Sequence, residues 1–525
     1  MSKDGKKPLG DSSVFQKGRK GAMRVIYGRT AIIAVSFLAQ IILIGGVVNF
    51  FRPYIPMFFG GYMVLGLGIV LLILNKETTP ETKLTVITML LPLVGAALYV
   101  YVETQPGYRL LAKRLNDIYK QTEAFVQQDE AVLDALEQKD IGTAQLARYV
   151  HKNGNFATYQ NTEVTFFPLG EDKFAAMLTE LERAEQFIFM EYFILKEGYM
   201  WEKILEILER KVQAGVEVRV MYDGTCAMFD LPYRYPEELK AKGMQCKMFA
   251  PIRPILSTHY NNRDHRKILV IDGKVGFTGG VNIGDEYINR VEKHGHWKDT
   301  AVMLRGEAVR SFTLMFLNMW AIDEHAMEAS RFLAYPTKPV MDAPGFVLPY
   351  SDSPVDGNKV GEQVYIDILS RARRYVHIMT PYLIIDHNME TALQYAAERG
   401  VDVHLILPGI PDKKYAFALA HTHYASLMKA GVKISEYTPG FVHAKVFVAD
   451  DREAVVGTIN LDYRSLYHHF ECAAYMLDVP CIADIEADFQ HTLKQCRRMT
   501  PERLKNDKLS MKVAGALLKA IAPLM

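Results

Sequence analysis

The chain has 525 residues, enough for two sizeable cores and an apolar N-terminal region. Its 61 basic and 60 acidic side chains leave a formal net charge of +1, so composition gives no electrostatic case for a nucleic-acid-binding protein. The five cysteines form no C-x-x-C pair, which argues against a zinc site or a disulfide framework.

The N-terminal part predicts a membrane region. Residues 1–29 form a basic flank, and residues 30–104 are mostly apolar. Three apolar stretches occur there, at 31–51, 54–74 and 84–102. Each stretch is near the ~20 residues that a helix needs to cross a bilayer. We therefore expect a multi-pass protein of the cell membrane.

The number of spans stays open at two or three. Three full spans starting from an inside N-terminus would put the rest of the chain outside. The basic residues that follow the last stretch, Arg109, Lys113 and Arg114, instead favour the inside. The conflict disappears if the first two stretches form a re-entrant hairpin, or if only one of them spans.

Beyond the apolar region the chain predicts a helical connector over 105–160 and then alternating strands and helices. This alternation indicates an α/β fold with two sandwich domains, 161–335 and 345–498, related by pseudo-two-fold symmetry. The tail, 499–525, is amphipathic, with one apolar stripe made of Leu509, Val513, Leu517 and Ile521. A helix on the membrane surface and a helix packed against the second domain fit this tail equally well.

A short pattern, H-x-K-x-x-x-x-D, occurs twice. The copies span residues 265–272 and 443–450, and each is followed at the same offset by a glycine turn that ends in asparagine, at 279–282 and 457–460. One copy would be weak evidence, because histidines also occur by chance in core strands. Two copies with matched turns indicate a duplicated site.

Each copy is a predicted strand, because apolar and partly β-branched residues run up to turn residues. Alternate side chains of a strand share a face, so the histidine and the lysine of each copy point the same way. The pairs are His265 with Lys267 and His443 with Lys445. The motif aspartates, Asp272 and Asp450, fall on the opposite face, and we expect them to fix the corner between strand and turn.

Two imidazoles and two ammonium groups at one point suit a phosphate ester that gains negative charge in its transition state. One histidine would attack phosphorus and the other would protonate the leaving oxygen. Asn282 and Asn460 follow the turns and could each bring a neutral donor beside a lysine. Ser465 could contact phosphate or brace the turn.

Each motif is followed by a carboxylate that could hydrogen-bond a catalytic imidazole and fix its tautomer. The candidates are Asp299 in the first half and Glu471 in the second, because both open an apolar strand after the asparagine turns. The alternative for each is a surface acid at a strand edge.

No metal or cofactor is expected, because the protein cations already supply the charge stabilisation. Three histidine pairs could be metal ligands, but no clustered aspartate, glutamate or cysteine completes a ligand set, and exposed loop histidines are the commoner case. They are His294 with His296, His421 with His423, and His468 with His469.

The two motifs resemble those of the phospholipase D superfamily, in which both copies form one active site. Four stretches narrow the likeness and resemble bacterial cardiolipin synthases. They are residues 262–273, 279–287, 296–300 and 456–465. The likeness runs from the membrane segments almost to the C-terminus. One departure is Gly457-Thr458, where family members often carry Gly-Ser, and it keeps the hydroxyl.

The resemblance implies two phospholipase D-like sandwiches and a membrane-bound phosphatidyltransferase that acts on phosphatidylglycerol and other anionic phospholipids. His265 is expected as the nucleophile and His443 as the acid and then the base, although near-symmetry makes this assignment reversible. The motif lysines and the two asparagines would hold the non-bridging oxygens. The sequence does not indicate an oligomeric state.

Two other classes of function are open. A lipid hydrolase of the same superfamily would use water in the second step. A nuclease or a catalytically silent lipid-binding scaffold is disfavoured by the apolar segments, the balanced charge and the intact duplicated motif.

Overall fold

The computed structural model describes residues 37–46, 60–62, 106–251, 262–324, 326–335 and 339–521. Residues 37–46 and 60–62 are helical and fall within the first two apolar stretches. Across the described ranges, no helix is both long enough and apolar enough to cross a membrane. The basic flank, the third predicted span and most of the other two lie outside the described residues.

Helices fill the predicted connector between the apolar region and the first strand. They are α6 (Pro106–Thr122), α7 (Glu130–Lys139) and α8 (Ile141–Gly154). The starts of α7 and α8 are set by aspartates, since Asp129 accepts a hydrogen bond from the Ala131 amide and Asp140 accepts one from the Thr143 amide. The segment is thus largely helical, and its role as a connector stays a prediction.

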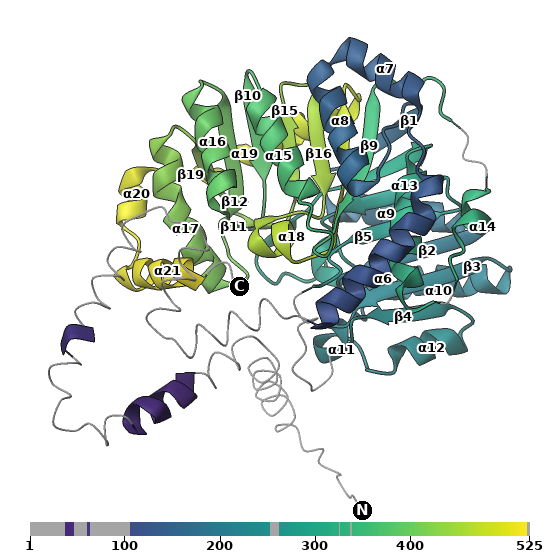
Figure 1. Ribbon diagram of the computed structural model, residues 1–525, viewed down its shortest axis with the longest axis horizontal. Coiled ribbons are helices and arrows are strands. Elements are labelled where there is room, and N and C mark those ends of the chain that lie inside the picture. Colours follow the sequence, from purple (N-terminus) through teal and green to yellow (C-terminus); the bar gives the residue numbers. More distant parts are fainter. Residues whose placement is uncertain are drawn as a thin grey trace, which may run out of the picture. The chain divides into compact units, whose positions relative to one another are not determined.

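The first half of the region that follows α8 is built on a seven-stranded sheet (Figure 1). Its strands, in spatial order, are β1 (Thr162–Phe167), β8 (Ala301–Gly306), β6 (Val275–Gly279), β5 (Lys267–Ile271), β2 (Phe187–Tyr192), β3 (Glu217–Asp223) and β4 (Gln245–Phe249). The helices of this half are α9 (Gly170–Glu182), α10 (Tyr199–Gln213), α11 (Cys226–Phe229), α12 (Tyr235–Ala241), α13 (Val309–Trp320) and α14 (Ala329–Leu333).

The second half is built on an eight-stranded sheet. Its strands, in spatial order, are β9 (Phe346–Asp352), β18 (Glu471–Leu477), β16 (Glu453–Gly457), β15 (Val446–Ala449), β10 (Tyr375–Met379), β12 (Asp402–Pro408), β13 (Lys433–Tyr437) and β19 (Cys496–Arg498). Its helices are α15 (Val360–Arg371), α16 (His387–Glu398), α17 (Lys414–Lys429), α18 (Tyr463–Tyr467), α19 (Cys481–Leu493), α20 (Pro501–Lys505) and α21 (Leu509–Ile521).

The two sheets repeat the same topology. In both, the first four neighbouring strand pairs are antiparallel and the next two are parallel, and the second sheet adds only β19 at its edge. The two motif strands, β5 and β15, hold the same position in this order. The expected α/β architecture with two related halves is therefore confirmed.

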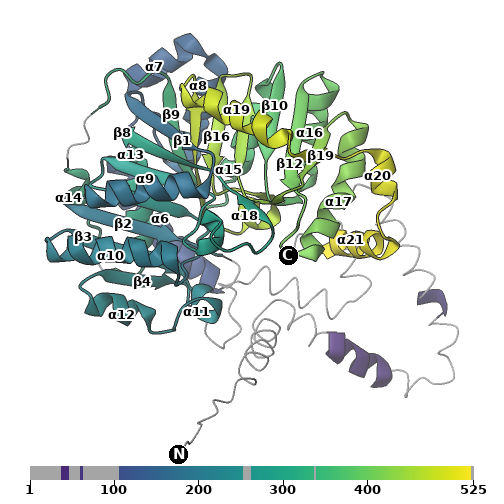
Figure 2. The same ribbon diagram turned by 180° about the vertical axis from the view of Figure 1, so that it is seen from behind.

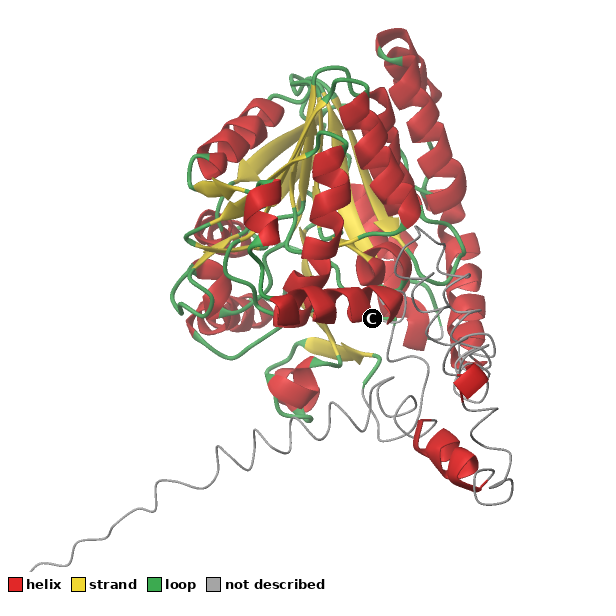
Figure 3. Ribbon diagram, turned by 90° about the vertical axis from the view of Figure 1, so that its left-hand side faces the viewer, coloured by secondary structure: helices red, strands yellow, loops and turns green. Residues whose placement is uncertain are grey.

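The halves share a core, which explains why they form one compact unit over Pro106–Pro251 and Asn261–Pro523. One face of the first sheet packs against α9 and α10. The other face places Phe189 against Phe316 of α13, with ring centroids 4.4 Å apart, in a core that continues through the second sheet. Helices lie on both sides of the strands (Figures 2 and 3). The domain boundaries predicted near residues 335 and 345 stay predictions.

The C-terminal helix α21 packs on α17 through a face that the apolar stripe does not include. Gly515 is buried, and a β-carbon there would lie 2.5 Å from the Ala418 carbonyl oxygen, so the two helices approach closely. The predicted stripe points outward instead, since Leu509, Val513 and Leu517 are 76%, 51% and 63% exposed. The tail thus combines both expected features, a packed face and an exposed apolar one.

Candidate active site

Each motif histidine sits just before its strand and is held by the backbone of the other half. The His265 amide donates to the Phe470 carbonyl at 2.9 Å, and the His443 amide donates to the Lys298 carbonyl at 2.7 Å. Both contacts tie the start of a motif to the residue before a candidate orienting carboxylate. The two halves are therefore joined at the place where the motifs begin.

The orienting carboxylates cross between the halves. Nδ1 of His265 lies 2.8 and 3.0 Å from the two carboxylate oxygens of Glu471, which belongs to the second half. Nδ1 of His443 lies 2.7 Å from Oδ2 of Asp299, which belongs to the first half. Each carboxylate binds Nδ1 and leaves Nε2 as the nitrogen available for chemistry. The sequence indicated these acids but not the exchange.

The two carboxylates are themselves held in place. Asp299 accepts a hydrogen bond from the Thr300 amide at 2.9 Å, and Glu471 accepts one from the hydroxyl of Thr458. Burial opposes the charge of Asp299, but His443 and Lys445 outweigh it and hold the pKa of this carboxyl below its usual range. Thr458 is the residue at which the chain departs from Gly-Ser, and its hydroxyl orients Glu471.

Two buried lysines lie in the same site. Lys267 and Lys445 are 0% and 1% exposed, and each Nζ donates to the carbonyl oxygen of its own motif histidine, His265 or His443. Burial lowers the pKa of Lys267 to about 8. Burial, together with the charge of Lys267, lowers that of Lys445 to about 7, although Asp299 opposes the change. A site with two such desolvated cations favours an anionic ligand.

Both motif imidazoles are neutral in this environment. Burial, followed by the charges of Lys267 and Lys445, holds the pKa of His265 well below its usual value. Burial and Lys445 lower the pKa of His443 to about 4, despite its contact with Asp299. A neutral imidazole carries the lone pair that a nucleophile or a general base requires.

The motif aspartates lie at the far ends of the motif strands. Asp272 accepts backbone hydrogen bonds from Glu185, Gln186 and Phe187 at 2.7 to 2.9 Å. In the second half, three amides donate to Asp450 in the same way, those of Arg373, Arg374 and Tyr375. These carboxylates fix the turn before β2 or β10, as expected of a corner residue, and do not contact the histidines.

The asparagines and Ser465 are buried beside the turns. The Asn282 carbonyl accepts from the Ile194 amide at 3.0 Å, and its amide nitrogen donates to the Tyr287 hydroxyl at 3.1 Å. The Asn460 side-chain oxygen and the Ser465 hydroxyl have no hydrogen-bond partner within the described part of the chain. Their predicted role as phosphate ligands stays a prediction.

Sequence reasoning did not place the residues that precede the two carboxylates by two positions beside the motif histidines. The Trp297 ring lies 5.3 Å from the His443 ring, and the His469 ring lies 5.5 Å from the His265 ring. Strand alternation, which puts residues two apart on one face, was the signal that could have found both.

The expectation that no acid gathers around the paired histidines was wrong for His469. Among the described residues, His265, His469 and Glu471 form one group whose ligand atoms lie within 4.8 Å of one another. His469 lies only two residues before Glu471, and its ring is 5.5 Å from that of His265, so all three side chains meet. A third buried lysine also lies nearby: Lys173 donates to the Val281 carbonyl at 3.1 Å, and burial lowers its pKa to about 7.

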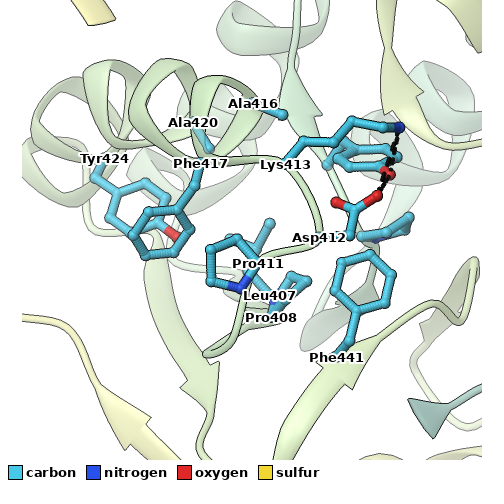
Figure 4. A pocket seen from close by; sticks show the side chains of 12 residues that line it. Leu407, Pro408, Pro411, Asp412, Lys413, Ala416, Phe417, Ala420, Tyr424 and Phe441 are labelled. Atoms are coloured by element: carbon cyan, nitrogen blue, oxygen red, sulfur yellow. Dashed lines mark hydrogen bonds and ion pairs between the residues drawn. The ribbon is translucent and has the colours of Figure 1, made fainter. Parts of the chain in front are cut away.

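A pocket opens in the second half between α17 and the loop that follows β12 (Figure 4). Its wall is mainly apolar and includes Pro411, Phe417, Tyr424 and Phe441. One lining residue, Phe441, has its ring 5.9 Å from the ring of His443. Tyr382 also lines this pocket, and its hydroxyl donates to Asp412 at 2.7 Å.

The amino-acid sequence of this chain is similar to those of known proteins. The family model for the phospholipase D-like domain of cardiolipin synthase matches residues 177–320 and 365–493. An uncharacterized protein of Streptococcus mutans is 53% identical over 461 residues, which cover 87% of this chain and all of that protein. A cardiolipin synthase of Geobacillus kaustophilus is 35% identical over 385 residues, covering 72% of this chain and 76% of that enzyme.

A solved structure shows the fold. The phosphatidylserine synthase of Haemophilus influenzae aligns with a TM-score of 0.55 and 16% identity, over 73% of this chain and 97% of that one. At this identity the likeness bears on the fold alone. The chain belongs to the cardiolipin synthase family of phospholipase D-like phosphatidyltransferases.

Proposed function

We propose that this enzyme transfers a phosphatidyl group from one phosphatidylglycerol to another and so makes cardiolipin. One observation carries the proposal. His265 and His443 each receive an orienting carboxylate from the opposite half, beside two buried lysines. This arrangement offers one nucleophile, one group that acts as acid and then base, and a cationic binding site for a phosphodiester.

In the first step, Nε2 of one histidine attacks phosphorus and the other histidine gives a proton to the leaving glycerol oxygen. The phosphorus–oxygen bond to glycerol breaks as the phosphorus–nitrogen bond forms. An anionic phosphodiester between the lysines raises the pKa values of the lysines and histidines around it. The histidine that acts as the acid therefore carries a proton when substrate is bound.

In the second step, a hydroxyl of another phosphatidylglycerol gives its proton to the second histidine and attacks phosphorus. The phosphorus–nitrogen bond breaks, and the two phosphatidylglycerols have become one cardiolipin and one glycerol. We keep His265 as the nucleophile and His443 as the acid and base, and the matched geometry of the two halves supports the reverse order equally well.

A hydrolase would use the same first step and would then admit water. We favour the lipid acceptor, because an anchored headgroup next to a buried intermediate acts at a high effective concentration. The near-complete burial of both histidines, 7% exposed each, limits access of bulk water.

The test uses the full chain reconstituted in vesicles with labelled phosphatidylglycerol. Cardiolipin and free glycerol should appear in near-equal amounts with little phosphatidic acid, and added glycerol should reverse the reaction. A preparation of the His265→Ala variant controls for contaminating activity. Phosphatidic acid as the main product at every substrate density would contradict the proposal and leave the hydrolase in its place.

Membrane attachment is part of the same proposal. We infer that the apolar N-terminal region anchors the protein in the cell membrane and that the exposed stripe of α21 contacts the lipid surface. The stripe is flanked by lysines, Lys508, Lys512 and Lys519, and α21 contains no acidic residue, which suits an anionic bilayer. Amide exchange in α21 should slow when the full chain moves from neutral detergent into phosphatidylglycerol vesicles.

A further inference from the structure

The two halves place different side chains at one equivalent position. Trp297 precedes Asp299 by two residues and adjoins His443, whereas His469 precedes Glu471 by two residues and adjoins His265. An indole offers one hydrogen-bond donor and no acceptor, but a neutral imidazole offers one of each. The site is therefore asymmetric at the position next to its catalytic groups.

His469 is buried, and among the described residues no group lies within hydrogen-bonding distance of its ring nitrogens. Its exposed fraction is 8%, and neither Nδ1 nor Nε2 makes a hydrogen bond to any residue that the structure describes. The nearest carboxylate oxygen, Oε1 of Glu471, is 3.8 Å from Nδ1. Burial lowers the pKa of His469 to about 3, so the ring is neutral. A buried donor and acceptor without partners cost free energy, which a ligand can recover.

Building on the proposed function, we propose that His469 binds the glycerol headgroup of phosphatidylglycerol by hydrogen bonds to the free hydroxyls of the glycerol. The acceptor nitrogen of the neutral imidazole favours a glycerol hydroxyl over a phosphodiester as the ligand. A phosphodiester has no hydrogen to donate to it, whereas a glycerol hydroxyl can both donate and accept. The Phe193 ring, 4.8 Å from His265 and 6.4 Å from His469, gives this side an apolar wall against the carbon chain of glycerol.

The experiment compares two soluble acceptors in phosphatidylglycerol vesicles that contain the full chain. Labelled glycerol carries two hydroxyls beyond the reacting one, and 1-propanol carries none. His469→Phe keeps a ring and removes both hydrogen-bonding atoms, so it should lower the ratio of kcat/KM for glycerol to that for 1-propanol roughly five- to tenfold, through KM for glycerol. His469→Gln keeps a donor and an acceptor and should restore most of the ratio.

His468→Phe is the matched control, because it changes the neighbouring half-buried histidine and should leave the ratio unchanged. An unchanged ratio in folded His469→Phe would overturn the inference, as would equal losses with both alcohols. Should that variant not fold, His469→Leu gives the same comparison. Activity that needs zinc in the wild type and not in His469→Gln would make the group with His265 and Glu471 a metal site instead.

The outcomes for the two proposals differ. A wild type that favours glycerol while its His469→Phe variant favours it equally refutes the headgroup role and leaves the synthase intact. A wild type that transfers phosphatidyl groups to water alone refutes the synthase, and the headgroup role falls with it.

Discussion

The two halves of this enzyme are alike in their sheets and unlike in their contributions to the site. Their strand order and the aspartate corners at Asp272 and Asp450 match. At the site, however, His265 is held by both oxygens of a glutamate and His443 by one oxygen of an aspartate, each from the opposite half. Duplication therefore supplied two copies of the framework but a single site, which neither half can complete alone.

The largest effect should come from breaking either half of that site. His265→Ala and His443→Ala should each lower cardiolipin formation by about 10³-fold or more, because one removes the nucleophile and the other the acid and base. The double variant should be little worse than either single one. Turnover of labelled phosphatidylglycerol gives the rates, and circular dichroism checks folding. Near-normal turnover in one folded single variant would refute a shared site.

The next largest effect should come from removing the carboxylate that each half supplies to the histidine of the other half. Asp299→Asn and Glu471→Gln should each reduce kcat by roughly 10² to 10⁴, since the imidazole loses the charge that fixes its tautomer. Asp299→Asn should also lower the pKa of His443, in the other half, because Asp299 raises it. Proton NMR titration of the histidine rings checks this result. A shift confined to His265 would be inconsistent with the crossing.

The lowered pKa values of the two site lysines predict how the rate depends on pH. The pKa values of about 8 for Lys267 and about 7 for Lys445 mean that the free enzyme loses site charge as pH rises through this range. The value of kcat/KM should therefore fall on the alkaline side, by up to tenfold per pH unit and per lysine lost. Bound phosphodiester raises these pKa values, so kcat should fall only at higher pH. If kcat and kcat/KM fell over the same alkaline pH range, bound phosphodiester would not raise the pKa values of these lysines.

The smallest effect on chemistry should come from the corners, where the two halves differ in burial. Asp272 is 4% exposed, whereas Asp450 is more accessible to water. Asp272→Ala leaves three amides without acceptors and should lower the free energy of unfolding by about 2–4 kcal/mol. Asp450→Ala should cost less, because water can reach its amides. Urea unfolding of both variants measures the difference, and equal losses would remove this distinction between the halves.

The sequence alone determined the local features of this protein. The period of apolar residues predicted the strands around both motifs, and the matched glycine turns predicted a duplicated α/β framework. The position of each motif aspartate on the opposite face from its histidine predicted a corner role, and the structure gives Asp272 that role through three backbone amides. Each of these inferences depends on neighbours a few residues apart, which is the range over which side-chain pattern encodes backbone shape.

Only the tertiary structure decided which groups meet. His443 contacts Asp299 across 144 residues, and His265 contacts Glu471 across 206. Pattern within a strand specifies the face of a side chain but not the strand that will oppose it from the other half. The same limit hid the surroundings of His469, whose ring nitrogens make no hydrogen bond within the part of the chain that the structure describes. The pKa values of the site lysines likewise come from burial and from charges brought together by the packing of two sheets, a property that the residues acquire only in the folded chain.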